Sequence, residues 1–287
     1  MADHESYLRL LNYSIPDREQ TWAIRDTILY ALGVGLGADP LDMKQLYFVY
    51  EGELRALPTM IAVLCPAQGW VRKSGTGFGA RGVAGEFGFT LHRPIPVQGE
   101  FFSKSKLVSV IDKGPGKGAL LTAGWKVYDK GTGELLASLA STTFCRGDGG
   151  FGGPKGPVKT PHSLPVTEPQ FVCDLPTIPQ AALVYRLSGD LNILHADPES
   201  AKRVGFSRPI LHGLCTFGVA GHALLRTLCD YDPSRLKSMQ VRFSAPVYPG
   251  ELLRTEMWIN GANISFRTVV PERDNLVVLD NGIAVIA

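Results

Sequence analysis

A short polar segment places a carboxylate, an amide and an imidazole within six positions of one another. Asp190, Asn192 and His195 lie in the run Ser-Gly-Asp-Leu-Asn-Ile-Leu-His, and Gly213 begins a helix-like segment shortly afterwards. An acid/base pair of this kind can hold a water molecule between its members. Backbone N–H groups at a helix start can face a developing negative charge, so the combination predicts acid/base chemistry beside an oxyanion site.

A structural interpretation of the same residues is also open. Asp190 could be a capping carboxylate and His195 a core imidazole, each ordering the turn without reacting. The presence of Asn192 favours a site, because one helical turn would direct all three side chains into one pocket. We therefore expect these three residues to act together.

The other histidines indicate structure rather than metal binding. His212 is expected to pack and form a hydrogen bond at the start of the helix, and His222 to be a satisfied residue of the core. His4, His92 and His162 have no acidic or cysteine partner at metal-ligand spacing, so we expect no metal site.

Composition narrows the class of protein. The 287 residues are 45% hydrophobic, which allows one large domain or two similar halves. The formal charge is +2 with scattered basic residues, so nucleic acid is not an expected partner. Five cysteines without a Cys-x-x-Cys pair indicate neither a disulfide framework nor a zinc site, and favour a reducing compartment.

The chain carries no recognisable targeting or membrane segment. The first residues lack a basic region followed by an apolar one, and no apolar run approaches the roughly 18 residues that could span a bilayer. We expect a cytoplasmic protein with no membrane partner. Val285–Ala287 is not a Ser-Lys-Leu address, although a peroxisomal location stays possible if a C-terminal signal has been lost.

A repeated turn divides the chain into two halves. Pro96–Glu100 and Pro246–Glu251 share a Pro-Val start and a Gly-Glu end before strand-like runs, about 150 residues apart. We predict halves at 1–145 and 171–287, joined by a Gly- and Pro-rich linker at 146–170. The linker glycines resemble a phosphate-binding loop, but no Gly-Lys-Ser/Thr follows, so the linker interpretation is preferred.

Each half predicts strands around a helix, an α+β layout. The second half has a helix at 213–228 that is apolar on much of its surface, preceded by extended chain at 183–187 and a short helix at 198–204 capped by Asp197. Its strands are expected at 238–245, 251–259, 263–270 and 276–285.

The first half predicts the same plan with a weaker central helix. A helix is expected at 19–33, with strands at 87–93, 100–112, 117–129 and 134–144. Leu57–Met60 stands where the second half has its helix start, and an interruption there would leave a cavity beneath the sheet. Residues 26–31 are placed opposite Asp190–His195 and lack the Asn and His, so only the second half is expected to be catalytic.

Three long motifs make the chain resemble the MaoC-like (R)-specific enoyl-CoA hydratases, the hydratase 2 family. They are the runs Tyr185–Pro198, Pro209–Gly218 and Val241–Gly250. The resemblance continues more weakly through the first half. It implies a double hot-dog fold, in which two antiparallel sheets each wrap a central helix, and usually a homodimer.

The resemblance also implies residue roles. Asp190, Asn192 and His195 match the hydratase residues, and Gly213 matches the oxyanion N–H. The family's acyl-CoA contacts match Gly85, Lys113 and Phe243, and Leu191, Ile193 and Leu194 are also expected to bind substrate. This chain departs from the family at Ala84, where a histidine is common, and at Leu191 and Ile193, where a bulkier residue and a proline are common.

The implied reaction is reversible hydration of a trans-2-enoyl-CoA to the (3R)-3-hydroxyacyl-CoA, without metal, nucleotide or flavin. Negative charge would collect on the thioester oxygen beside Gly213 while Asp190 and His195 activate water. Asn192 would orient the water or the thioester. The alternatives are a hot-dog acyl-CoA thioesterase and a non-catalytic acyl-CoA binding module.

Overall fold

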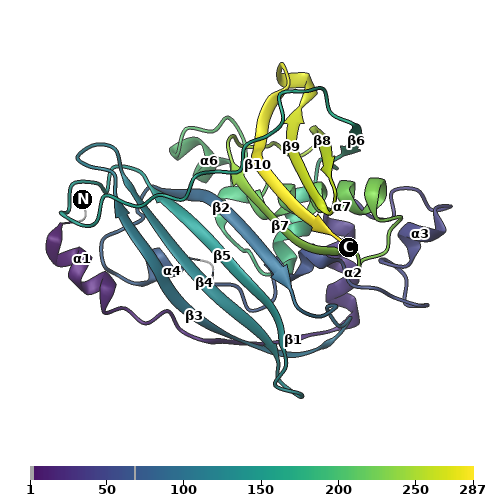
Figure 1. The fold of residues 1–287 in the computed structure, drawn as a ribbon, viewed down its shortest axis with the longest axis horizontal. Coiled ribbons are helices and arrows are strands. Elements are labelled where there is room, and N and C mark those ends of the chain that lie inside the picture. Colours follow the sequence, from purple (N-terminus) through teal and green to yellow (C-terminus); the bar gives the residue numbers. More distant parts are fainter. Residues whose placement is uncertain (1–2, 68) are drawn as a thin grey trace.

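The chain folds around one continuous antiparallel sheet. A computed structural model describes residues 3–67 and 69–287. Its ten strands lie in the order β1-β3-β4-β5-β2-β7-β10-β9-β8-β6, so strands of each half stay together (Figure 1). They are β1 Arg18–Trp22, β2 Gly82–Leu91, β3 Gly99–Asp112, β4 Ala119–Asp129, β5 Leu135–Cys145, β6 Phe171–Pro176, β7 Leu236–Phe243, β8 Leu252–Asn260, β9 Asn263–Val270 and β10 Leu276–Ile286.

The helices are short apart from one. They are α1 His4–Leu11, α2 Ile24–Gly33, α3 Met43–Leu46, η1 Pro58–Ala62, α4 Trp70–Lys73, α5 Ala181–Tyr185, η2 Arg186–Ser188, η3 Ile193–His195, α6 Pro198–Arg203, α7 Gly213–Leu228 and η4 Pro271–Arg273. Within the described part of the chain, no helix has the length and apolar character needed to cross a membrane.

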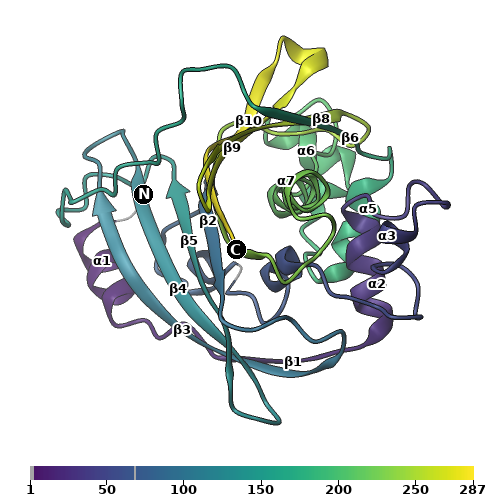
Figure 2. The ribbon, with the colours of Figure 1, turned by 45° about the vertical axis from the view of Figure 1, so that its right-hand side comes forward.

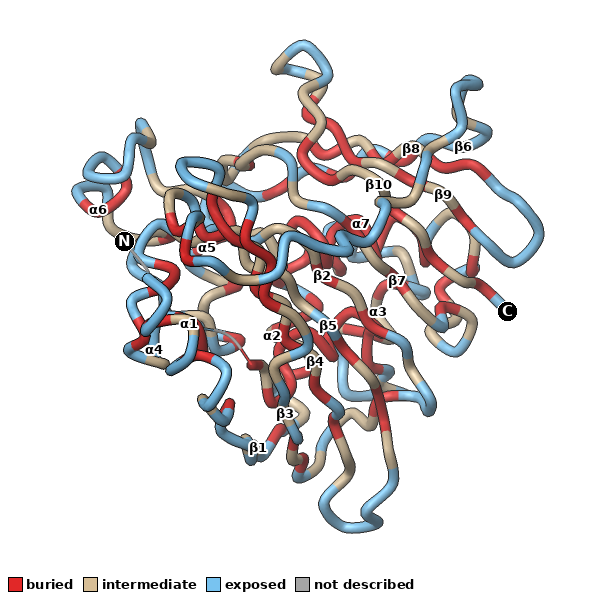
Figure 3. Tube along the Cα trace, turned by 60° about the vertical axis from the view of Figure 1, so that its left-hand side comes forward, coloured by how far each residue is buried: buried red, intermediate tan, exposed pale blue. Residues whose placement is uncertain are grey.

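Helix α7 is the core of the second half. Every residue from Cys215 to Leu225 is buried, and strands β6 to β10 curl around the helix (Figures 2 and 3). A helix that is apolar on all sides needs such a cover. The predicted helix at 213–228 is confirmed.

The two halves share a boundary and part of their core. Strand β2 pairs with β7 through the register Glu86↔Arg242 to Thr90↔Ser238. Phe217 of α7 packs edge-on against Phe87 and Phe89 of β2, with ring centroids 5.0 and 6.0 Å away. The first half therefore forms one wall around the helix of the second.

The predicted strands are confirmed with shifts of a few residues at their ends, except for β2, which begins five residues earlier than the predicted start at 87. Both repeated turns lead into strands, with Glu100 in β3 and Glu251 directly before β8. The short helix α6 is capped as expected, because the Asp197 carboxylate accepts hydrogen bonds from the N–H groups of Glu199 and Ser200 at 3.1 and 3.2 Å.

The helix predicted at 19–33 was wrong at its start. Residues 18–22 form β1 against β3, and α2 begins at Ile24. The Asp26 carboxylate accepts the N–H of Ala23 at 2.9 Å, which marks the true helix start. Residues 26–31 therefore lie inside α2, while Asp190–His195 form a loop and a 3₁₀ turn, so the two segments are not structurally equivalent.

The extended chain predicted at 183–187 was also wrong. Residues 181–188 form α5 and η2, with Ala181, Ala182 and Tyr185 buried at helical spacing. Gly33 of α2 lies directly against Tyr185, where an added Cβ would be 3.6 Å from the Tyr185 Cα. This packing overrides the strand preference of the Leu-Val-Tyr sequence.

The interrupted central helix of the first half is confirmed. The equivalent segment is the 3₁₀ helix η1, and all five of its residues are buried. Met60 and Ile61 are fully enclosed in the apolar core beneath the sheet. That this half accommodates an acyl chain stays a prediction, as do the three segment boundaries.

Residues 146–170 contain no helix or strand and run from β5 to β6 across the sheet (Figure 2). The buried carboxylate of Asp112 accepts the N–H groups of Gly150 and Gly152 at 2.7 and 2.9 Å. Burial opposes ionisation of Asp112, but these N–H groups, with that of Gly114, lower its pKa overall. The N–H groups of this glycine-rich segment thus bind a carboxylate of the chain itself.

Candidate active site

The segment after η2 reverses direction through two successive side-chain turns. Gly189 has a φ of 117°, a left-handed conformation that favours glycine. Asp190 Oδ1 then accepts the N–H of Asn192, and Asn192 Oδ1 accepts the N–H of Leu194, both at 3.2 Å. These bonds lead the chain into η3 and bring His195 back towards Asp190.

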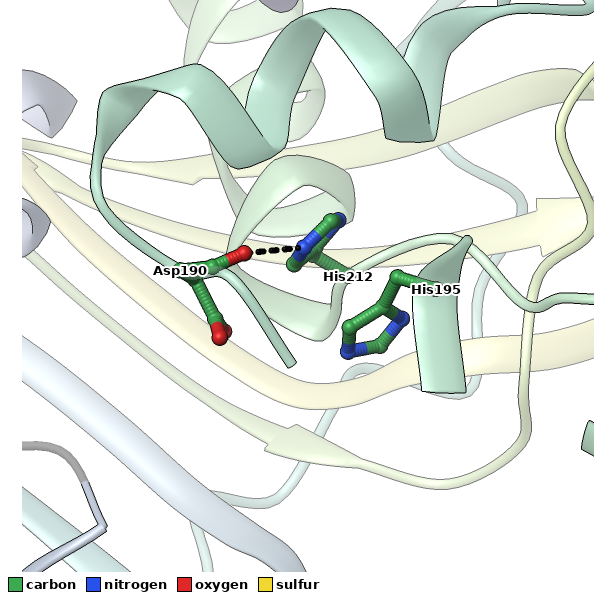
Figure 4. Close-up of side chains that lie close together, drawn as sticks. All are labelled: Asp190, His195 and His212. Atoms are coloured by element: carbon green, nitrogen blue, oxygen red, sulfur yellow. Dashed lines mark hydrogen bonds between the residues drawn. The ribbon is translucent and has the colours of Figure 1, made fainter. Parts of the chain in front are cut away.

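Asp190, His195 and His212 meet at one point (Figure 4). One carboxylate oxygen of Asp190 and one ring nitrogen of each histidine lie within 4.8 Å of one another. Both histidines are buried, at 8% and 1% exposure, whereas Asp190 is half-buried. The predicted pairing of Asp190 with His195 is therefore present in the geometry, and their catalytic roles are taken up below.

The tautomer of His195 follows from its hydrogen bond. Its Nδ1 lies 2.8 Å from the carbonyl oxygen of Ile210. A carbonyl oxygen only accepts, so Nδ1 carries the hydrogen and neutral His195 has its lone pair on Nε2. Burial lowers the pKa of His195, although the Ile210 carbonyl and the Asp190 charge act in the opposite direction. The imidazole is thus a neutral base at physiological pH.

His212 joins this pair from the start of α7. Its ring stacks on that of His195 with centroids 3.7 Å apart and planes 27° from parallel. Its Nε2 donates to the backbone oxygen of Asp190 at 3.1 Å. Burial, with the neighbouring His195 charge, lowers the pKa of His212 to about 4. The expected packing role is confirmed, but the contact with His195 was missed because it depends on tertiary structure.

His222 is a satisfied core residue, as predicted. Its two ring nitrogens contact the Val34 carbonyl and the Tyr231 hydroxyl at 3.3 and 3.1 Å.

The geometry favours proton transfer over metal coordination. Two imidazoles that bind one ion direct their lone pairs at it from within their ring planes. The rings of His195 and His212 are instead stacked, and the Nε2 of His212 already donates to Asp190. The site suits an acid/base pair supported by a second ring.

Gly213 is the first residue of α7, so its N–H lies at the positive end of the helix dipole. The ring of Phe243 packs over this glycine: an added Cβ would lie 3.2 Å from the Phe243 Cε1. Glycine therefore allows close approach to the helix start. A carbonyl oxygen beside the pair could accept this N–H.

A cavity of about 710 Å³ lies against the sheet, and Phe243 is one of the residues that line it. It lies along β2, β5 and β7, and Pro157–Lys159 of the connecting segment form one edge. Gly85, Lys113 and Phe243, three of the predicted substrate-binding residues, line this same cavity. Asp190 and His195 are not in its lining, whereas Phe243, which lines the cavity, also packs over Gly213.

The remaining predicted residues surround the turn. Leu191 and Ile193 are 61% and 58% exposed, and Leu194 is half-buried. Asn192 is exposed and uses its Oδ1 to cap η3. Their contact with a substrate stays a proposal.

Sequence comparison identifies known domains in both halves. Residues 152–281 match the MaoC like domain, and residues 21–147 match the MFE-2 hydratase 2 N-terminal domain. The chain is 37% identical to the peroxisomal enoyl-CoA hydratase 2 of Arabidopsis thaliana, covering 94% of this chain and 92% of the relative. It is 40% identical to the 3-hydroxyacyl-thioester dehydratase Y of Mycobacterium tuberculosis, covering 91% of each.

Structural comparison agrees. A MaoC-like dehydratase from Phytophthora capsici matches with a TM-score of 0.85 at 35% identity, covering 98% of both chains. A Mycobacterium tuberculosis protein described as a double hotdog fold matches with a TM-score of 0.58 at 14% identity, covering 96% of this chain and 97% of that one. The fold is therefore a double hot-dog of the α+β class. The chain belongs to the hydratase 2 family of MaoC-like proteins.

Proposed function

We propose that this chain is an enoyl-CoA hydratase, a hydro-lyase of fatty acyl-CoA metabolism. It adds water reversibly to a trans-2-enoyl-CoA and forms the (3R)-3-hydroxyacyl-CoA. The observation that carries the proposal is the meeting of the Asp190 carboxylate and the His195 ring beside the first turn of α7. The relatives named enoyl-CoA hydratase 2 and 3-hydroxyacyl-thioester dehydratase support the same reaction.

The proposed chemistry begins with water held between Asp190 and His195. The free Nε2 of His195 takes one proton from the water as the oxygen bonds to Cβ of the enoyl group. The Asp190 carboxylate holds the second hydrogen and stabilises the imidazolium. The proton removed from water is returned to Cα, so the pair ends the cycle as it began.

The negative charge that develops on the thioester oxygen needs a hydrogen-bond donor of its own. As the Cβ–O bond forms, the electrons of the double bond move onto the thioester carbonyl and create an enolate. The N–H of Gly213 donates to this oxygen, and the dipole of α7 favours the negative charge. Asn192, through its side-chain amide, orients the water or the thioester.

The acyl-CoA is proposed to occupy the cavity that Gly85, Lys113 and Phe243 line, because Phe243 also packs over Gly213 at the helix start. Gly85 allows close approach of the substrate, and Lys113 provides a positive charge for a phosphate. Arg146, Lys159 and Arg242 are also among the residues that line the cavity, which supports an anionic ligand. Leu191, Ile193 and Leu194 are proposed to contact the acyl group.

The direct test is incubation of the purified chain with crotonyl-CoA. We expect loss of the enoyl absorbance, no free thiol, and a product that chiral analysis identifies as the (3R) alcohol. Release of free CoA would instead identify a thioesterase. Tight binding without any absorbance change would identify a binding module, and either result contradicts the proposal.

Two further properties are proposals. The family resemblance supports a homodimer, which light scattering of the purified chain would test. We also retain a cytoplasmic location, with the peroxisome as the alternative that the names of the Arabidopsis and mouse relatives support. Fluorescence imaging of two fusions, one that leaves the N-terminus free and one that leaves the C-terminus free, would distinguish the two locations.

A further inference from the structure

His212 contacts both members of the acid/base pair and the helix that follows them. Its Nε2 donates to the backbone oxygen of Asp190 at 3.1 Å, and its ring covers one face of His195 at 3.7 Å. It is also the cap residue directly before Gly213. One side chain thus joins the three groups that the proposed hydration requires.

The hydrogen bond to the Asp190 backbone oxygen defines which nitrogen of the His212 ring carries the hydrogen. Because the acceptor is a carbonyl oxygen, Nε2 carries the hydrogen, and neutral His212 leaves Nδ1 bare. Nδ1 is fully buried and has no hydrogen-bond partner among the residues that the structure describes. Protonation would place an unpaired N–H at Nδ1 in this buried position, so the surroundings favour the neutral ring.

A second aromatic ring lies beside His212. Tyr185, which is 1% exposed, lies 5.1 Å from His212 between ring centroids. The imidazole is therefore in contact with the rings of both Tyr185 and His195. A ring confined in this way can fix the orientation of its neighbour.

A neutral ring beside His195 favours the proton transfer of the proposed reaction. In the proposed reaction, His195 becomes positively charged when it takes a proton from water. A charged neighbour at 3.7 Å would oppose that step, whereas a neutral imidazole does not. Apolar packing alone would supply the stacking but would leave the Asp190 oxygen without its donor.

We propose that His212 is a positioning residue, a permanently neutral imidazole that fixes the Asp190 backbone by donation and the His195 ring by stacking. This inference rests on the proposed hydration. It assigns His212 no contact with the substrate. His212 thus has two functions, donation to the Asp190 backbone oxygen and packing on the His195 ring. Two substitutions can separate these functions.

His212→Phe keeps an aromatic ring but removes the donor, and His212→Gln keeps a donor but removes the ring. We expect His212→Phe to lower kcat for crotonyl-CoA roughly 10- to 100-fold with KM nearly unchanged, because misplaced groups slow chemistry more than binding. His212→Gln should recover most of the lost kcat. In an Asp190→Asn background the Phe substitution should have little further effect.

Two kinetic results would overturn the proposal. One is a His212→Phe enzyme with kcat within twofold of the wild type. The other is an equal loss in both variants that multiplies with Asp190→Asn, as a general packing defect would. If the wild-type chain hydrates crotonyl-CoA while these variants behave so, only the role of His212 fails; if the wild type is inactive, the proposed function itself fails.

A measurement on the wild-type chain keeps the test independent of variant folding. Nitrogen NMR of histidine-labelled protein should show one ring in the Nε2–H form that does not titrate between pH 5.5 and 8. The His212→Gln spectrum assigns this signal by its absence. Titration of His212 within that range would contradict the neutral role.

Discussion

The Nδ1 of His195 lies 2.8 Å from the carbonyl oxygen of Ile210, and this contact leaves Nε2 as the free base of the site. The same burial that encloses the ring lowers its pKa. A neutral imidazole whose free nitrogen faces a carboxylate can take a proton from water without first losing one of its own.

We predict that hydration activity persists into mildly acidic solution. His195 must be neutral to act, and burial places its pKa below the ordinary value of 6.5. As pH falls, kcat/KM for crotonyl-CoA should therefore decline only below pH 6.5. A pH–rate profile between 5 and 8 tests this, and a midpoint above 6.5 in the acid limb would contradict it.

Gly213→Ala should damage activity without damaging the fold. The new Cβ would press on the Phe243 ring at 3.2 Å and restrict access to the helix start. Alanine favours helix while its Cβ crowds the Phe243 ring, so thermal stability should change little. The backbone N–H of residue 213 is kept, but the new Cβ would obstruct it, so we expect kcat/KM to fall about tenfold or more, because oxyanion donors have large effects on rate. Unchanged kinetics in a folded variant would remove Gly213 from the oxyanion site.

Lys113→Ala should weaken binding of the CoA portion. One partly exposed charge pair is worth up to about 1 kcal/mol, so KM for crotonyl-CoA should rise roughly fivefold with kcat unchanged. Lys117→Ala is the matched control, because Lys117 belongs to the same turn but is not among the residues that line the cavity. Crotonyl-pantetheine, which lacks the nucleotide, should not distinguish the two variants; equal effects with crotonyl-CoA would contradict the assignment.

Folding stability should fall as the solution becomes acidic. Burial lowers the pKa values of His195, His212 and His222, the last two to about 4. The unfolded chain takes up these protons near pH 6.5 while the folded chain does not, so stability is full above 6.5 and is lost towards pH 4.

Each of the two strongly shifted histidines contributes a loss on the order of 3 kcal/mol across that window. Urea unfolding at pH 7.5, 6 and 5 should show a decreasing midpoint. His222→Gln should reduce the slope with pH, since one proton uptake is removed. A midpoint as high at pH 5 as at pH 7.5 would show that these histidines are not held neutral.

The sequence predicted what depends on neighbours along the chain. The Asp190 to His195 turn is local, and the side chains of Asp190 and Asn192 order it by bonds to N–H groups two positions ahead. The helix at 213–228 is apolar on much of its surface and has no broad polar face to turn to solvent, so the pattern predicts a helix that other elements cover. Both features were recognisable without tertiary structure.

The structural features that the sequence did not predict depend on contacts between segments that are distant in the chain. Residues 181–185 are helical because Tyr185 packs against α2, and residues 18–22 are a strand because β3 lies beside them. The stacking of His212 on His195 depends on where α7 begins relative to η3. Periodicity and spacing carry no information about such contacts.

The meeting of three proposed substrate-binding residues in one cavity also depends on tertiary structure. Gly85 and Phe243 come together because β2 pairs with β7, a register that joins the two halves. Their spacing in the sequence does not reveal this pairing. The family resemblance supplied these residues, and the structure places them in one cavity.

The most direct test is the rate of crotonyl-CoA hydration by Asp190→Asn and His195→Gln, measured beside the wild type with stability checked by thermal unfolding. Each variant should be folded and slower by roughly 10² to 10⁴-fold, the range for losing a general acid or base. Near wild-type rates in both folded variants would contradict the assignment of Asp190 and His195 as the hydration pair.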